Sequence, residues 1–104
     1  MKKNKVLPLT ETTYYILLAL LEPAHGYLII QNIEELSNNT VRMAAGTMYG
    51  ALENLMKLKY IKLIDNEDKR RKVYQITDAG KDILNQQYER YLHIVKVSEE
   101  YLVR

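Results

Sequence analysis

The sequence predicts a mainly α-helical fold with a small β-hairpin, a winged helix-turn-helix, followed by one long C-terminal dimerisation helix. Three observations predict this fold. Three helical patterns with short breaks between them fill residues 10–58. Two short β-prone runs then flank a polar turn, and a heptad repeat of apolar residues occupies the last quarter of the chain. We expect residues 1–77 to form the winged helix-turn-helix and residues 78–104 to form the dimerisation helix.

Length and composition indicate one globular domain. The chain has 104 residues, of which 47% are hydrophobic and 27% charged, a balance typical of folded rather than disordered proteins. Cysteine is absent, which excludes disulfides, thiolate metal sites and a cysteine nucleophile. The N-terminus lacks the apolar run of a signal peptide, and the longest apolar run, 16–21, is too short to cross a membrane. We therefore expect a cytoplasmic protein with no membrane partner.

The first helical pattern runs from Thr10 to Leu21. Thr10 is a suitable N-cap, Glu11 suits the first turn, and Pro23 marks the end. The helix is apolar nearly all round, which predicts burial on more than one side. In so short a chain, a second copy of the chain is a natural cover for the surplus apolar surface.

A turn with the sequence PAHG leads to a second helix, from Tyr27 to about Ser37, which carries a single apolar stripe. The polar run SNN then breaks the chain. We expect Val41 and Met43, which alternate with polar neighbours, to form a short strand. A third helix follows, from about Ala45 to Leu58.

The third helix has an apolar face and a small, nearly uncharged face. Leu52 marks the inner face, and a set of residues lies within about 60° of it on the helical wheel: Ala45, Met48, Leu55 and Met56. The outward side is formed by Thr47, Gly50, Asn54 and Lys57, with Gly46, Glu53 and Tyr49 on the flanks. A glycine inside a helix costs about 1 kcal/mol against alanine, so Gly50 indicates close approach of another surface. Such a face suits a recognition helix in the DNA major groove; the alternative is an ordinary surface helix.

The predicted hairpin joins Ile61–Ile64 to Lys72–Thr77 through the polar segment DNEDKRR. Four successive cations lie at its tip: Lys69, Arg70, Arg71 and Lys72. They suit contacts with phosphates or the minor groove. The alternative is a solvated charge run that the neighbouring carboxylates balance. The net charge is only +2, but residues 42–72 hold eight Lys and Arg against four Asp and Glu.

The last helix begins after Thr77, and its apolar-leaning residues recur at heptad spacing, weakened by Ser98. We expect it to pair with a second chain together with the first helix. The predicted dimer contacts are Tyr14, Leu17, Leu18, Leu84, Tyr88, Tyr91, Leu92, Val95 and Leu102. Tyr15, Tyr88, Tyr91 and Val95 are expected to wall a cavity for a flat apolar ligand; the alternative is a plain dimer core without a cavity.

Nothing in the sequence predicts catalysis. The two histidines, His25 and His93, fall on separate elements, and no nucleophile–base set, phosphate-binding glycine loop or metal-ligand spacing occurs. We therefore expect a protein that is not an enzyme and that has neither metal nor cofactor.

Several motifs together resemble the PadR family of bacterial transcriptional regulators. They are 25-HGY-27, 46-GTMYGALENLMKLKYI-61, 70-RRKVYQIT-77 and 78-DAGK-81. Their order and spacing resemble that family over residues 9 to 103, and the single C-terminal helix resembles its short subgroup.

The resemblance implies a homodimeric repressor that binds a pseudo-palindromic operator in double-stranded DNA and is released by a small planar or aromatic effector. By position, Gly46, Thr47, Tyr49, Asn54 and Lys57 would face DNA from the third helix. Arg70, Arg71 and Lys72 would do so from the wing, and Tyr27 from the supporting helix. Two departures from the family pattern are Ala44, where a polar cap is usual, and Gly50, where a bulkier residue is usual. The alternative function is a winged-helix protein-interaction module that does not bind DNA.

Overall fold

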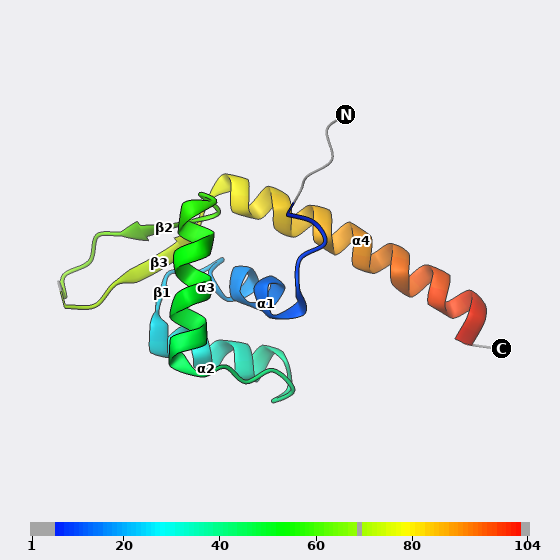
Figure 1. Cartoon of the computed structure of the whole chain (residues 1–104), viewed down its shortest axis with the longest axis horizontal. Helices are drawn as coiled ribbons and strands as arrows, with labels where there is room; N and C mark the ends of the chain where they lie inside the picture. Colours follow the sequence, from blue (N-terminus) through cyan, green and yellow to red (C-terminus); the bar gives the residue numbers. More distant parts are fainter. Residues whose placement is uncertain (1–5, 69, 103–104) are drawn as a thin grey trace.

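The computed structural model describes residues 6–68 and 70–102. Lys69, one of the predicted DNA contacts, lies outside the described residues. The elements follow in the predicted order of three helices, hairpin and long helix (Figure 1). The helices are α1 (Glu11–Ala19), α2 (Gly26–Leu36), α3 (Ala45–Lys57) and α4 (Asp78–Leu102), and the strands are β1 (Ala24–His25), β2 (Ile61–Ile64) and β3 (Val73–Ile76). The predicted winged helix with a long C-terminal helix is confirmed.

Local signals set most helix ends. The Thr10 hydroxyl accepts a hydrogen bond from Thr13 N at 3.0 Å, so the predicted cap of α1 is formed. At the end of α2, Asn38 and Asn39 have positive φ angles of 54° and 63°, a conformation that asparagine tolerates better than most residues. The predicted break at SNN is therefore a left-handed turn that redirects the chain toward α3.

The sheet differs from the prediction in two places. The PAHG turn contains a third strand, because β1 pairs antiparallel with β3 through Ala24↔Tyr74 and His25↔Val73. The strand order is β1-β3-β2, so β3 is central. The predicted strand at Val41 and Met43 is wrong: both are half-buried in an irregular segment. Alternation of apolar and polar residues over so short a stretch reports burial of one side and not strand pairing.

One core joins all three helices of the winged helix to the sheet and to the first turns of α4. Its most buried side chains are Ile16, Leu17, Leu20, Ile29, Ile33, Met48, Leu52 and Ile83. Leu17 is 0% exposed and Leu84 is 7% exposed, so residues of the same chain already cover both. The prediction that these two side chains contact a partner chain is corrected here, because periodicity indicates an apolar face without saying which neighbour covers it.

Four elements meet at Thr77. The Thr77 hydroxyl donates to Lys59 O at 2.7 Å and accepts from Gly80 N at 3.0 Å, while Thr77 N donates to Tyr60 O at 2.9 Å. A Cβ atom on Gly80 would collide with the Tyr60 carbonyl oxygen and lie 2.6 Å from Ile76 Cγ1. The Thr77 hydroxyl and the absence of a side chain at Gly80 thus bring four segments together. These segments are the end of α3, the beginning of β2, the end of β3 and the start of α4.

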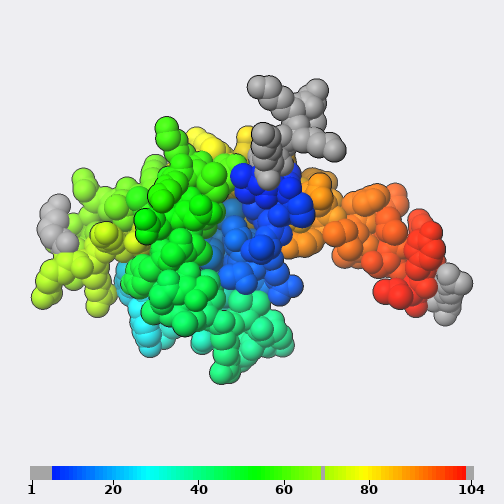
Figure 2. All heavy atoms as spheres, in the orientation of Figure 1, coloured from blue at the N-terminus to red at the C-terminus, as the bar shows by residue number. Residues whose placement is uncertain are grey.

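Beyond this junction α4 leaves the body of the molecule. Its first turns pack on α1, and its second half projects alone (Figures 1 and 2). Apolar residues remain exposed along that half, namely Leu92, Ile94, Val95, Val97, Tyr101 and Leu102. An exposed apolar stripe of this length marks an interaction surface.

Gly80→Ala should destabilise the fold by about 1–3 kcal/mol, because the methyl group meets a backbone carbonyl that cannot move without shifting β2. Chemical denaturation monitored by circular dichroism measures the change. Gly46→Ala is the matched control, since a Cβ atom at Gly46 meets nothing within 4 Å. Equal stability of the Gly80 variant and the wild type would contradict this account of the junction.

Candidate nucleic-acid interface

The outward face of α3 is exposed over its whole length. Met48, Leu52 and Leu55 are buried, as predicted for the inner face, whereas Ala45 in the first turn is exposed and does not belong to that face. The predicted outward residues are all exposed: Gly46, Thr47, Gly50, Asn54 and Lys57. Among the described residues, one charged pair lies on this side, Lys57 Nζ and Glu53 Oε1 at 3.9 Å, and it is solvated and therefore weak.

Neither glycine of α3 is required by packing inside the chain. A Cβ atom at Gly46 or at Gly50 would meet no atom within 4 Å. The cost of about 1 kcal/mol for a glycine in a helix is therefore not offset by a close contact within this chain. The first turn of α3 also lacks a side-chain cap, because Ala44 occupies the N-cap position. Small residues and uncapped amides leave the N-terminal half of α3 open to another molecule.

The carboxylate of Asp68 organises the cations of the wing. Asp68 Oδ1 accepts from Arg70 N at 3.0 Å and from Arg70 Nε at 3.3 Å, and Asp68 Oδ2 lies 3.8 Å from Arg71 Nε. Asn66 Nδ2 donates to Arg71 O at 3.1 Å and closes the loop. The acidic residues of the wing thus do more than balance charge: one of them fixes the turn that presents Arg70 and Arg71.

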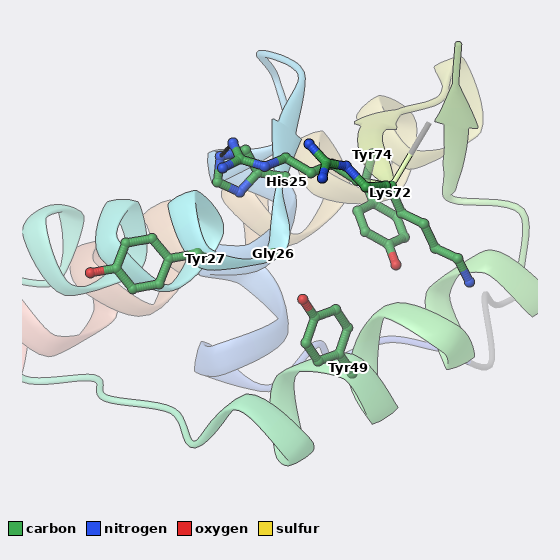
Figure 3. Close-up of a pocket in the computed structure, with 8 residues that line it drawn as sticks. His25, Gly26, Tyr27, Tyr49, Lys72 and Tyr74 are labelled. Carbon is green, nitrogen blue, oxygen red and sulfur yellow. Dashed lines mark hydrogen bonds between the residues drawn. The ribbon is translucent and has the colours of Figure 1, made fainter. Parts of the chain in front are cut away.

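A pocket of about 570 Å³ lies between the wing and the helices (Figure 3). It is lined by His25, Gly26, Tyr27, Tyr49, Arg70, Arg71, Lys72 and Tyr74. Five of these residues are predicted DNA contacts, and the fold brings them together from α2, α3 and the wing. His25, Gly26 and Tyr74 were not predicted. They reach the pocket because β1 pairs with β3, and the sequence gives no signal for that pairing.

Inside this pocket, the hydroxyls of Tyr49 and Tyr74 point into the same space, while the ring of Tyr27 points away from it (Figure 3). Arg71 Nη1 lies 3.3 Å from His25 Nε2. Because a guanidinium group only donates hydrogen bonds, the imidazole accepts in this contact. A Cβ atom on Gly26 would collide with the hydroxyl end of Tyr49, so glycine at this position allows Tyr49 to reach the start of α2.

Comparison with known families identifies this arrangement. The family model described as the Transcriptional regulator PadR-like family matches residues 16–86. The chain belongs to the PadR-like family. No curated protein matches the chain.

Several solved structures resemble this PadR-like chain. A transcriptional regulator from Clostridium thermocellum is 27% identical, with a TM-score of 0.70 over 88% of this chain and 92% of its own. A PadR-like transcription factor from Bacteroides fragilis is 25% identical, with a TM-score of 0.73 over 86% of this chain and 87% of its own. A PadR family regulator from Clostridium difficile is 27% identical, with a TM-score of 0.66 over 86% and 97%. Each of these matches covers more of the chain than residues 1–77, so the similarity includes part of α4 as well as the winged helix.

The second surface of this PadR-like chain is the exposed side of α1 and α4. The rings of Tyr14 and Tyr91 meet edge to face, with centroids 4.9 Å apart and planes at 79°. Burial raises the pKa of Tyr14, and the neighbouring Tyr91 and Tyr88 raise it further. Burial also raises the pKa of Tyr91, with additional effects from Glu11 and Tyr15. The four tyrosines predicted to lie together on this side are therefore close in space.

Around this aromatic cluster, the predicted contacts Tyr88, Leu92, Val95 and Leu102 are exposed, and Leu18 is half-buried. A groove of about 390 Å³ is lined by Tyr14, Leu18, Leu21, Lys81, Leu84, Asn85 and Tyr88. It includes Tyr88 but not the other predicted effector residues, Tyr15, Tyr91 and Val95. Sequence reasoning missed a second exposed stripe, Ile94, Val97 and Tyr101, although its spacing of three and four residues is a helical signal.

Two further observations concern the described residues. Among them, no group of three or more His, Asp and Glu side chains is arranged to hold a metal ion. No helix within the described part of the chain has the length and apolarity required to cross a membrane.

Gly50→Ala should raise the free energy of unfolding by about 0.5–1 kcal/mol, because alanine is the better helix former and the space for its methyl group is open. Denaturant titration of the two proteins measures the difference. A loss of stability would mean that the backbone at Gly50 needs a glycine for reasons internal to the chain.

Proposed function

We propose that this PadR-like regulator is a homodimeric repressor that binds a pseudo-palindromic operator in double-stranded DNA in the cytoplasm. The observation that carries the proposal is the face of α3, whose two glycines have nothing packed on them and which lies beside the cations of the wing. A helix with small outward residues brings its backbone close to a second surface. Cations at its side favour a polyanion as that surface.

In the proposed complex, α3 lies in the major groove. Asn54 and Thr47 are short polar side chains of the kind that read base edges, and Lys57 reaches either a base or a phosphate. Arg70, Arg71 and Lys72 of the wing contact phosphates, as do the hydroxyls of Tyr27 and Tyr49 at the flanks. Phosphate contacts fix the register of the protein on the duplex, and contacts from α3 supply sequence preference.

The proposed dimer uses the exposed faces of α1 and α4. The seam is formed by residues of the sequence prediction: Tyr14, Leu18, Tyr88, Tyr91, Leu92, Val95 and Leu102. The second stripe, Ile94, Val97 and Tyr101, lies on a different side of the same helix. Twofold symmetry would then set the two α3 helices about one DNA turn (~34 Å) apart. A stripe of exposed apolar side chains on a projecting helix supports pairing with a second copy, because such a stripe is unfavourable in water.

A small planar or aromatic effector fits this function. The groove beside Tyr14 and Tyr88 is lined by apolar and aromatic side chains together with Lys81 and Asn85, and a wall with aromatic rings and a few polar groups suits flat ligands. Bound there, an effector would release DNA by favouring a dimer arrangement with the wrong spacing between the two α3 helices.

Arg71→Ala should weaken DNA binding and lower the slope of log affinity against log salt by about one, because one phosphate contact is lost. Lys57→Ala should also weaken binding. Fluorescence anisotropy with a labelled duplex from upstream of the protein's own gene, and with a scrambled duplex, measures both effects. Lys96→Ala on the exposed side of α4 is the matched control.

The same titration discriminates between the two functions considered for the fold. Salt-steep binding that prefers the upstream duplex supports a repressor. Wild-type protein that binds neither duplex at low salt would favour a protein-interaction module instead, and unchanged affinity of both α3 and wing variants would reject the mapped interface.

Val95→Glu should weaken dimerisation by at least about tenfold, because a carboxylate would be buried in an apolar seam. Sedimentation equilibrium measures the dissociation constant, and circular dichroism checks that α4 remains helical. Lys96→Glu provides the control, since it adds a carboxylate at the next position on another side of the helix. A Val95 variant that dimerises as tightly as the wild type would exclude this face as the seam.

A further inference from the structure

Tyr74 has a buried ring, and its hydroxyl opens on a pocket. The side chain is only 5% exposed, yet among the described residues none forms a hydrogen bond with its hydroxyl. The hydroxyl points into the pocket between the wing and the helices (Figure 3). Burial raises the pKa of Tyr74, and the nearby Tyr49 raises it further, so at neutral pH this group is a protonated donor. Because this donor faces the pocket and no described residue pairs it, a ligand in the pocket can accept its hydrogen bond.

The groups around Tyr74 are suited to an anion. Tyr49 supplies a second hydroxyl aimed into the same space (Figure 3). Arg71 supplies a guanidinium group at the rim, held 3.3 Å from His25 Nε2. The N-terminus of α2 opens here as well, because Gly26 and Tyr27 line the pocket and the N-cap residue His25 makes no side-chain cap. Uncapped amides at a helix N-terminus favour negative charge.

The polar groups that line the pocket are either positively charged or neutral. Neither Asp nor Glu lines the pocket among the described residues. Among the described residues, Asp68 is the acidic side chain that pairs with the lining, 3.3 Å from Arg70 Nε and 3.8 Å from Arg71 Nε. The Arg71 side chain is 62% exposed, so its contacts with Asp68 and His25 are solvated and weak, and an anion in the pocket can compete with them.

We propose that this pocket is a phosphate seat that holds one phosphodiester group of the DNA backbone, with the Tyr74 hydroxyl as its innermost donor. The assignment rests on the proposed function and adds to it a position: the seat lies at the flank of α3 from which Tyr49 extends. A strand that follows the outward face of α3 would therefore pass its opening. The seat recognises a phosphate oxygen and not a base, so it contributes equally to every DNA sequence.

The test uses Tyr74→Phe, which removes one oxygen and keeps the ring in the core. The variant should be as thermally stable as the wild type, because the hydroxyl removed forms no hydrogen bond with any described residue. It should bind the upstream duplex and the scrambled duplex roughly tenfold more weakly, the effect of one lost hydrogen bond to a charged group. The salt slope should stay the same, since no charge is removed. Tyr60→Phe, which removes a tyrosine hydroxyl outside both the pocket and the proposed dimer seam, is the matched control.

A second measurement does not depend on DNA. Inorganic phosphate, added against sodium chloride at constant ionic strength, should shift the amide NMR signals of Gly26 and Tyr27 in the wild type. The same titration of Tyr74→Phe should show weaker binding. This arm reports the seat itself, because it follows backbone groups at the start of α2 directly.

The two arms separate the seat from the proposed function. Suppose that the wild type binds DNA, that Tyr74→Phe binds it equally well, and that phosphate shifts neither amide signal. The proposal of a phosphate seat is then wrong, while the proposed repressor function stands. If phosphate binds in a manner that depends on Tyr74 but the DNA affinity does not, the seat takes a free anion, and its assignment to the DNA backbone is wrong. If the wild type binds no duplex and phosphate still shifts both amides, the proposed function fails and the backbone assignment fails with it, leaving a site for a free anion.

Discussion

The hydroxyl of Thr77 is the point through which the parts of this protein are oriented. It donates to Lys59 O after α3 and accepts from Gly80 N in α4, and Gly80 lies directly against the Tyr60 carbonyl. These contacts involve the C-terminus of α3, the first residue before β2, the end of β3 and the start of α4. The direction of the projecting helix is therefore set relative to α3 and the wing by backbone contacts, which are stiffer than contacts between flexible side chains.

Local physical chemistry was sufficient to predict the helices. The Thr10 cap, the SNN turn and the start of α4 after Thr77 are short-range signals, and they are formed as expected. What the sequence lacks is information on which surfaces meet. Leu17 and Leu84 are apolar residues of the right periodicity, but α1 and α4 cover each other within one chain before any partner does. The β1 strand is two residues long, too short for any periodic signal, and depends on its register with β3.

The sequence predicts only some of the residues that line the pocket at the wing. Composition and helical spacing predict its cations and Tyr49. His25, Gly26 and Tyr74 line the pocket only because β1 pairs with β3. Asp68 illustrates the same limit for charge. A tally of charges treats it as a neutraliser of Arg70 and Arg71, but its oxygens hold the backbone and side chain of Arg70 in place. The geometry makes one acidic residue a support for the cations beside it.

The length of α4 gives it mechanical leverage. Its 25 residues span about 37 Å, and the backbone contacts at Thr77 attach it firmly to α3 and the wing. In a pair of chains joined by their projecting helices, a change of about 10° in crossing angle would move each winged helix by roughly 6 Å over such a length. That displacement is close to two base-pair steps of a duplex with ~3.4 Å rise. A small molecule would thus need to alter the angle between two helices only slightly to take both α3 helices out of phase with the DNA.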